Sequence, residues 1–149
     1  MRKLLAALAV AALTGIGVAA VAIAGDTGPS SANAESVTYV AGNPTCPAGT
    51  VGSFKVEPVA NGTYNDLVTI SNFDGKTLDW ALTPEALDLY DVAYVIVKGG
   101  PNANLYTYDF ASGGLDDSDT GLHPPVNPNG KGPKYYGFSH VDFCFDPKG

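Results

Sequence analysis

The chain has 149 residues, with eight basic and fifteen acidic side chains and a formal net charge of −7. This acidic balance argues against nucleic acid and anionic membrane surfaces as partners, because both are normally bound by a basic face. A net negative charge is ordinary for an extracellular protein, because net charge helps to keep a protein soluble. The length suits one domain with a single core.

The N-terminus has the layout of a secretory signal: a positive start, then a run of apolar and small residues from position 4 to 24 that Gly, Asp and Pro break. Ala32 and Ala34 are the small residues that signal peptidase accepts three and one places before its cut. We therefore expect a signal peptide at 1–34 and a secreted domain at 35–149. The apolar run exceeds the usual core of roughly 7 to 15 residues and is long enough to span a bilayer, so an uncleaved anchor is the alternative. The membrane would be contacted only through this segment.

Two cysteines, Cys46 and Cys144, lie near the two ends of the expected domain. An even pair in an exported chain is most simply one disulfide, and we predict that these two residues form it. Closing a loop of about a hundred residues stabilises a fold by roughly 4 to 5 kcal/mol in the chain-entropy view, less any strain.

After residue 35, short β-type runs alternate with Gly, Pro, Asn and Asp, and no helical period is sustained. The pattern predicts seven strands, near 37–40, 51–59, 64–73, 77–82, 92–98, 105–110 and 137–145. We expect an all-β fold: a single antiparallel β-sandwich of immunoglobulin-like or jelly-roll type, closed by the disulfide. Residues 92–97 are apolar at every position, which predicts a central strand covered on both faces.

Three segments between the predicted strands have local sequence signals of their own. Thr83 and Pro84 have the chemistry of a helix cap and first helical position, and they predict a helix of at most two turns. Gly99 and Gly100 suit a tight turn. Residues 111–134 are rich in Gly, Asp, Ser, Pro and Asn, which predicts a long polar loop that is functional or mobile.

Asp116, Asp117 and Asp119 place three carboxylates close together inside this loop. Hard oxygen ligands of this kind suit Ca²⁺, so a calcium site is one hypothesis, although the spacing is not that of an EF-hand. The alternative is that the carboxylates cap turns and solvate the loop. No other cofactor is expected.

Aromatic residues suggest a second hypothesis. Tyr106 and Tyr108 fall on one face of a predicted strand, and with Trp80, Tyr135 and Tyr136 they could form a platform for a glycan or a partner protein. The alternative is that these side chains fill the half-buried face of a sheet, where aromatic residues are enriched.

The two histidines, His123 and His140, do not suggest zinc, since both cysteines are assigned to the disulfide. Ser139, His140 and Asp142 invite comparison with a catalytic triad. However, alternation along a strand sends Ser139 to the face opposite the other two, so neighbours in one strand cannot form that triad.

Three segments of the second half, 95–101 (VIVKGGP), 119–125 (DTGLHPP) and 139–144 (SHVDFC), together with Tyr106, form an ordered series. This series resembles a module that recurs in uncharacterised bacterial secreted and surface proteins. The resemblance implies an extracellular β-module whose late cysteine pairs with an early one, and it implies no particular activity.

The function predicted from the sequence is that of a non-catalytic extracellular or cell-surface module that binds a protein, glycan or cell-envelope component. One alternative is a small secreted hydrolase that uses carboxylates or His140, which would need a concave site where such groups converge. Another is a purely structural surface component with an exposed apolar patch or an unpaired sheet edge.

Overall fold

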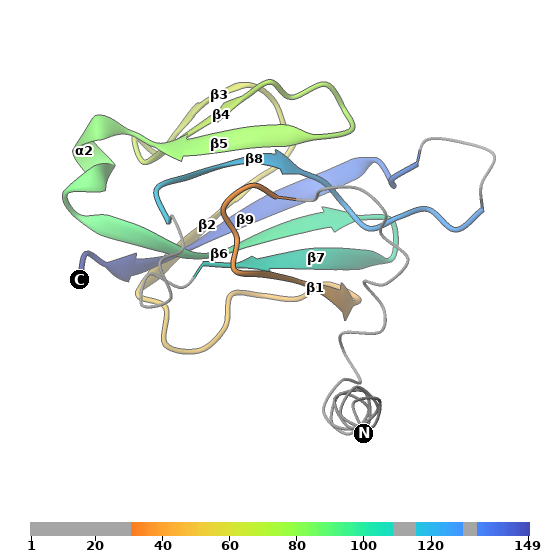
Figure 1. The fold of residues 1–149 in the computed structure, drawn as a ribbon, viewed down its shortest axis with the longest axis horizontal. Helices are drawn as coiled ribbons and strands as arrows, with labels where there is room; N and C mark the ends of the chain where they lie inside the picture. The colour runs from red at the N-terminus through yellow and green to blue at the C-terminus, as the bar shows by residue number, and fades with distance from the viewer. Residues whose placement is uncertain (1–30, 109–115, 130–133) are drawn as a thin grey trace, which may run out of the picture.

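The computed structural model describes residues 31–108, 116–129 and 134–149, which form two antiparallel sheets packed together (Figure 1). The larger sheet contains β1 (Ser36–Ala41), β2 (Gly52–Val56), β6 (Tyr90–Gly99), β7 (Asn102–Thr107) and β9 (Phe138–Pro147), in the order β1-β7-β6-β9-β2. The smaller contains β3 (Gly62–Tyr64), β4 (Val68–Ser71), β5 (Leu78–Leu82) and β8 (Ser118–Leu122), in the order β3-β4-β5-β8. The predicted β-sandwich with one disulfide is confirmed. Within these ranges, no helix is long and apolar enough to cross a membrane.

Strand β6 occupies the centre of the larger sheet, as its continuous apolar run predicts. Val95 and Val97 face the core between the sheets, whereas Ile96 belongs to a second cluster on the other face, and all three are fully buried. In a strand covered on both sides, nearly every residue has its apolar surface removed from water. This explains why apolar and polar residues do not alternate in the run.

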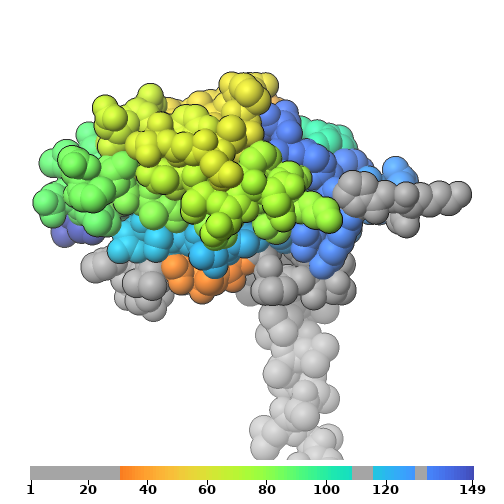
Figure 2. All heavy atoms as spheres, turned by 90° about the horizontal axis from the view of Figure 1, so that it is seen from above, coloured from red at the N-terminus to blue at the C-terminus, as the bar shows by residue number. Residues whose placement is uncertain are grey.

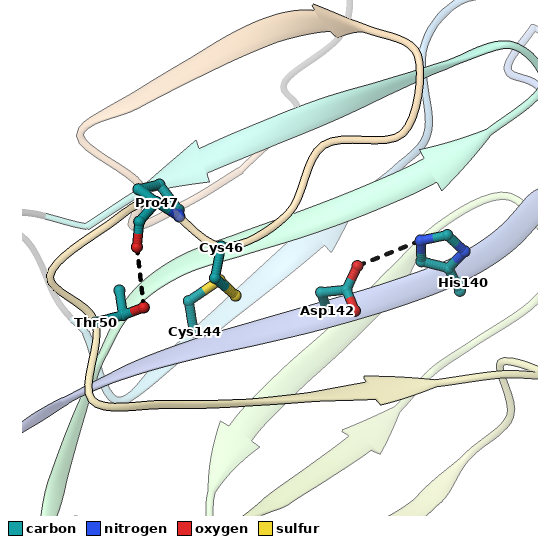
Figure 3. Close-up of a disulfide and its surroundings, with 6 residues drawn as sticks. All are labelled: Cys46, Pro47, Thr50, His140, Asp142 and Cys144. Atoms are coloured by element: carbon teal, nitrogen blue, oxygen red, sulfur yellow. Dashed lines mark hydrogen bonds and ion pairs between the residues drawn. A yellow bond between two sulfur atoms is a disulfide. The ribbon is translucent and has the colours of Figure 1, made fainter.

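The outer face of β6 is covered because β1 and β2 lie at opposite edges of the same sheet. The chain between them, residues 42–51, therefore crosses that face (Figure 3). Cys46 in this crossing segment is bonded to Cys144 on β9, with 5.7 Å between the Cα atoms. The disulfide thus holds the crossing segment against the sheet and confirms the predicted pairing.

Large aromatic side chains dominate the core between the two sheets. Trp80 on β5 and Phe143 on β9 are both buried, with ring centroids 5.8 Å apart. At one end of the sandwich, α2 (Pro84–Leu87) connects the smaller sheet to the larger (Figure 1). The Thr83 side chain accepts a hydrogen bond from the Ala86 amide, so the predicted cap is confirmed.

Two differences from the seven predicted strands give nine in the described residues, and the bounds also shift, with β2 ending at Val56 and β7 covering Asn102–Thr107. Residues 64–73 contain parts of two strands, because Asn65 and Asp66 turn the chain at φ 50° and 56°. The region predicted as a loop, 111–134, contains β8, whose five residues include only one large apolar side chain and so have no strand-like pattern. Within that region 111–115 and 130–133 lie outside the described residues, as do 109–110 of the predicted strand 105–110 and 1–30 of the predicted signal.

Candidate functional site

The three carboxylates of the calcium hypothesis lie at and just before β8. Asp119 is only 1% exposed, and its carboxylate already accepts hydrogen bonds from the Tyr108 hydroxyl at 2.8 Å and the Thr120 amide at 2.7 Å. Burial, with the nearby Asp91 charge, raises the pKa of Asp116. In the ranges that the structure describes, no group of three His, Cys, Asp or Glu is placed to hold a metal ion. The calcium site at Asp116, Asp117 and Asp119 gains no support from this arrangement and stays a prediction.

Three of the five members of the predicted aromatic platform are buried in the core. Tyr106 and Tyr108 do share a face, but it is the inner face, and with Trp80 they are buried between the sheets. The Trp80 indole nitrogen donates to the Tyr108 hydroxyl at 3.3 Å. Burial, and after it the charge of Asp119, raises the pKa of Tyr108 well above its usual value. These side chains stabilise the core and present no surface to a ligand.

The other two members, Tyr135 and Tyr136, are half-buried in a segment that runs antiparallel to residues 125–127. The Tyr135 ring stacks on His123 with 3.6 Å between centroids, and Lys134 lies 5.0 Å from the Tyr135 centroid. Tyr136 packs so closely on the β6–β7 turn that a Cβ at Gly100 would lie 2.6 Å from its ring. Both tyrosines are therefore largely engaged with their own chain.

A cavity of about 210 Å³ opens beside β2. Three aromatic residues form its apolar wall: Phe54 lies 5.6 Å from Phe145, and Tyr90 lies 5.8 Å from the same ring, measured between centroids. Val51, also in the lining, has 59% of its surface exposed. We call this cavity the edge cleft; its complete lining is Val51, Gly52, Ser53, Phe54, Asn65, Leu67, Tyr90 and Phe145.

The position of the edge cleft follows from the topology. Among the described residues, β2 is the last strand of its sheet and pairs on one side only, with β9. Asn65 and Leu67, which line the cleft, come from the β3–β4 turn of the other sheet. The cleft therefore lies where the two layers of the sandwich meet at an edge strand, a place where extended peptides can pair with exposed backbone.

Comparison with protein-family models, curated proteins and solved structures gives no match. The function must therefore be argued from the geometry of this chain. The resemblance carried by segments 95–101, 119–125 and 139–144 stays a prediction.

A second cavity, of about 130 Å³, lies between the crossing segment and the outer face of the larger sheet, beside the disulfide (Figure 3). His140 and Asp142 project from β9 into this region, with 3.3 Å between Nε2 and the nearer carboxylate oxygen. Burial raises the pKa of Asp142, and the opposing charges of His140 and Lys55 only partly offset it.

His140 and Asp142 are in contact, but catalysis by nucleophilic attack also needs a hydroxyl or thiol that the imidazole can activate. Ser139 is exposed near the start of β9, where the register with β6 shifts, so alternation does not fix the face of its side chain and the predicted opposite face stays a prediction. Among the described residues, none makes a hydrogen bond of good geometry to Nε2 of His140. No described hydroxyl is therefore bonded to that nitrogen, and the hydrolase alternative stays a prediction.

The edge cleft has almost no signature in the sequence. The alternation around Phe54 indicates a strand with one wet face, but Tyr90 and Phe145 stand far from it in the chain. Val51, a large apolar residue that precedes an edge strand and stays exposed, is the one local feature that indicates the cleft.

Proposed function

We propose that this chain is a secreted, non-catalytic binding module that holds an extended segment of a partner protein along β2. The edge cleft is the observation that supports this function. In the bound state, the partner backbone would pair with the free side of β2 and place one large apolar side chain against Phe54, Tyr90 and Phe145.

The size of the edge cleft favours a side chain over a free small molecule. Pockets for drug-sized ligands measure about 300 to 1,000 Å³, and this one measures about 210 Å³. That volume suits a single aromatic or branched anchor, and such anchors carry most of the energy at protein interfaces. A glycan is less well matched, because the predicted aromatic platform is mostly inside the core.

The negative charge of the chain indicates what charge a partner segment should carry. The chain carries a net charge of −7, and Asp66, between the lining residues Asn65 and Leu67, is exposed. A partner segment with basic residues flanking its apolar anchor would be attracted to this acidic surface, and its rate of association would fall as salt rises.

The test is a screen of a displayed library of random 12-residue peptides on the purified, disulfide-bonded protein. We expect the enriched peptides to combine an apolar anchor with basic residues. Amide chemical shifts should then move at β2 and in the β3–β4 turn. Val51→Glu should weaken binding about tenfold or more, because it puts a charge at the mouth of the cleft.

Leu89 is the matched control, because it is 58% exposed and lies outside the cleft lining. Leu89→Glu should leave the affinity unchanged. Enrichment of no peptide, or of peptides whose shifts map to residues 125–136 instead of β2, would contradict the proposal.

A further inference from the structure

The most elaborate polar site in the described chain is built around the carboxylate of Asp119. One oxygen accepts hydrogen bonds from the Tyr108 hydroxyl and the Ser31 hydroxyl. The other accepts from three amides: Thr120 at 2.7 Å, Ala32 at 2.8 Å and Asn33 at 2.9 Å. Five donors around one carboxylate stabilise its charged form and offset the cost of burying it.

Three of these five donors belong to residues 31–33, just before the cut expected after Ala34. The segment is folded around the carboxylate, because the Ser31 hydroxyl also accepts from the Ala34 amide at 2.8 Å. The Asn33 side-chain amide donates to the Ser118 carbonyl of β8 at 2.7 Å. Residues 31–34 therefore dock on the edge strand of the smaller sheet.

The next residue continues on the other sheet, since the Glu35 amide donates to the Thr107 carbonyl of β7 at 2.8 Å. In Figure 2 the first described residues, in orange, lie against β8, in light blue. The segment thus spans from one layer of the sandwich to the other along one side.

We propose that the Asp119 carboxylate and the edge of β8 form a binding site for residues 31–34, and that the mature domain retains them. Any removal of the leader then occurs before Ser31 and not after Ala34. A chain that began at Glu35 would keep only the donors of Tyr108 and Thr120 among the described partners of the Asp119 carboxylate, so three of its five hydrogen bonds would be lost.

The first test is the intact mass of the disulfide-bonded protein recovered after expression of the full chain in a host with an export pathway. We expect the recovered chain to include Ser31, whether or not a leader has been removed. A mature protein that begins at Glu35 would overturn the proposal.

The second test measures coupling by thermal unfolding of the same full chain. Ser31→Ala and Asp119→Asn should each lower Tm, by roughly 4 °C or more. The double variant should lose much less than the sum, because both changes disrupt one interaction. Asp117→Asn is the control, since the Asp117 carboxylate contacts only Ser118 among the described hydrogen-bond partners. The site would be contradicted if the Tm losses of Ser31→Ala and Asp119→Asn were additive in the double variant. It would also be contradicted if Ser31→Ala combined with Asp117→Asn showed an equally large departure from additivity.

Discussion

Replacing Cys46 and Cys144 together with alanine should lower the free energy of unfolding by about 4 to 5 kcal/mol. The bond joins residues 98 apart in the sequence, so its removal allows the denatured chain to gain the entropy of a long open loop. Cys144 is fully buried beside Ile96, and the lost sulfur atoms leave space that adds to the loss. At about 4 °C per kcal/mol, Tm should fall by roughly 15 to 20 °C.

Urea denaturation of the oxidised protein and of the double alanine variant, each followed by tryptophan fluorescence, measures this difference. Reduced wild-type protein serves as the control, because it keeps both sulfur atoms and loses only the covalent bond. A loss of about 1 kcal/mol or less would refute the reasoning, since the denatured chain would then be as constrained without the bond as with it.

Three further predictions, two of them with a matched control variant, test local features by denaturant unfolding. Gly99→Ala should cost about 1 to 3 kcal/mol, because its Cβ would lie 2.4 Å from Pro124, whereas Gly137→Ala, with no atom near its Cβ, should cost far less. Thr83→Ala should cost about 1 to 2 kcal/mol, since its hydroxyl donates to a turn carbonyl at 2.7 Å and caps α2, and Thr83→Ser should retain both bonds. Asp142→Asn should be more stable than wild type at pH 7 and equal to it below about pH 3.8: the folded-state pKa of Asp142 is raised, so wild type loses stability as pH rises through that pKa. Equal stability of Asp142→Asn at pH 7 would contradict this.

The sequence predicts those parts of the fold that depend on a local apolar pattern or on the chemistry of individual residues. The run from Val92 to Val97 gives the central strand, Thr83 gives the helix cap, and two cysteines give one disulfide. Strand β8 escapes prediction because its place in the sheet depends on pairing with β5 and on the contacts of Asp119, both of which join distant residues.

The candidate sites are even harder to predict from the sequence, because they also depend on contacts between distant residues. Alternation correctly puts Tyr106 and Tyr108 on one face of a strand, but period-two reasoning cannot say which face is the inner one. The edge cleft needs Phe54, Tyr90 and Phe145 to meet, and their meeting depends on the register of β2, β9 and β6. A pattern in one segment contains no information about that register.

The edges of the two sheets connect the two proposals. Natural sheets protect edge strands from pairing with other chains, by covering them or keeping them short. Strand β3 has three residues, and β8 is covered by residues 31–34, whereas β2 has five residues, an exposed Val51 and a cleft beside it. Removing residues 31–34 would uncover β8 as a further open edge, in addition to β1 and β2 of the larger sheet. Peptides that place an anchor in the edge cleft should therefore bind the full chain at β2, while a chain starting at Glu35 should also bind peptides at β8.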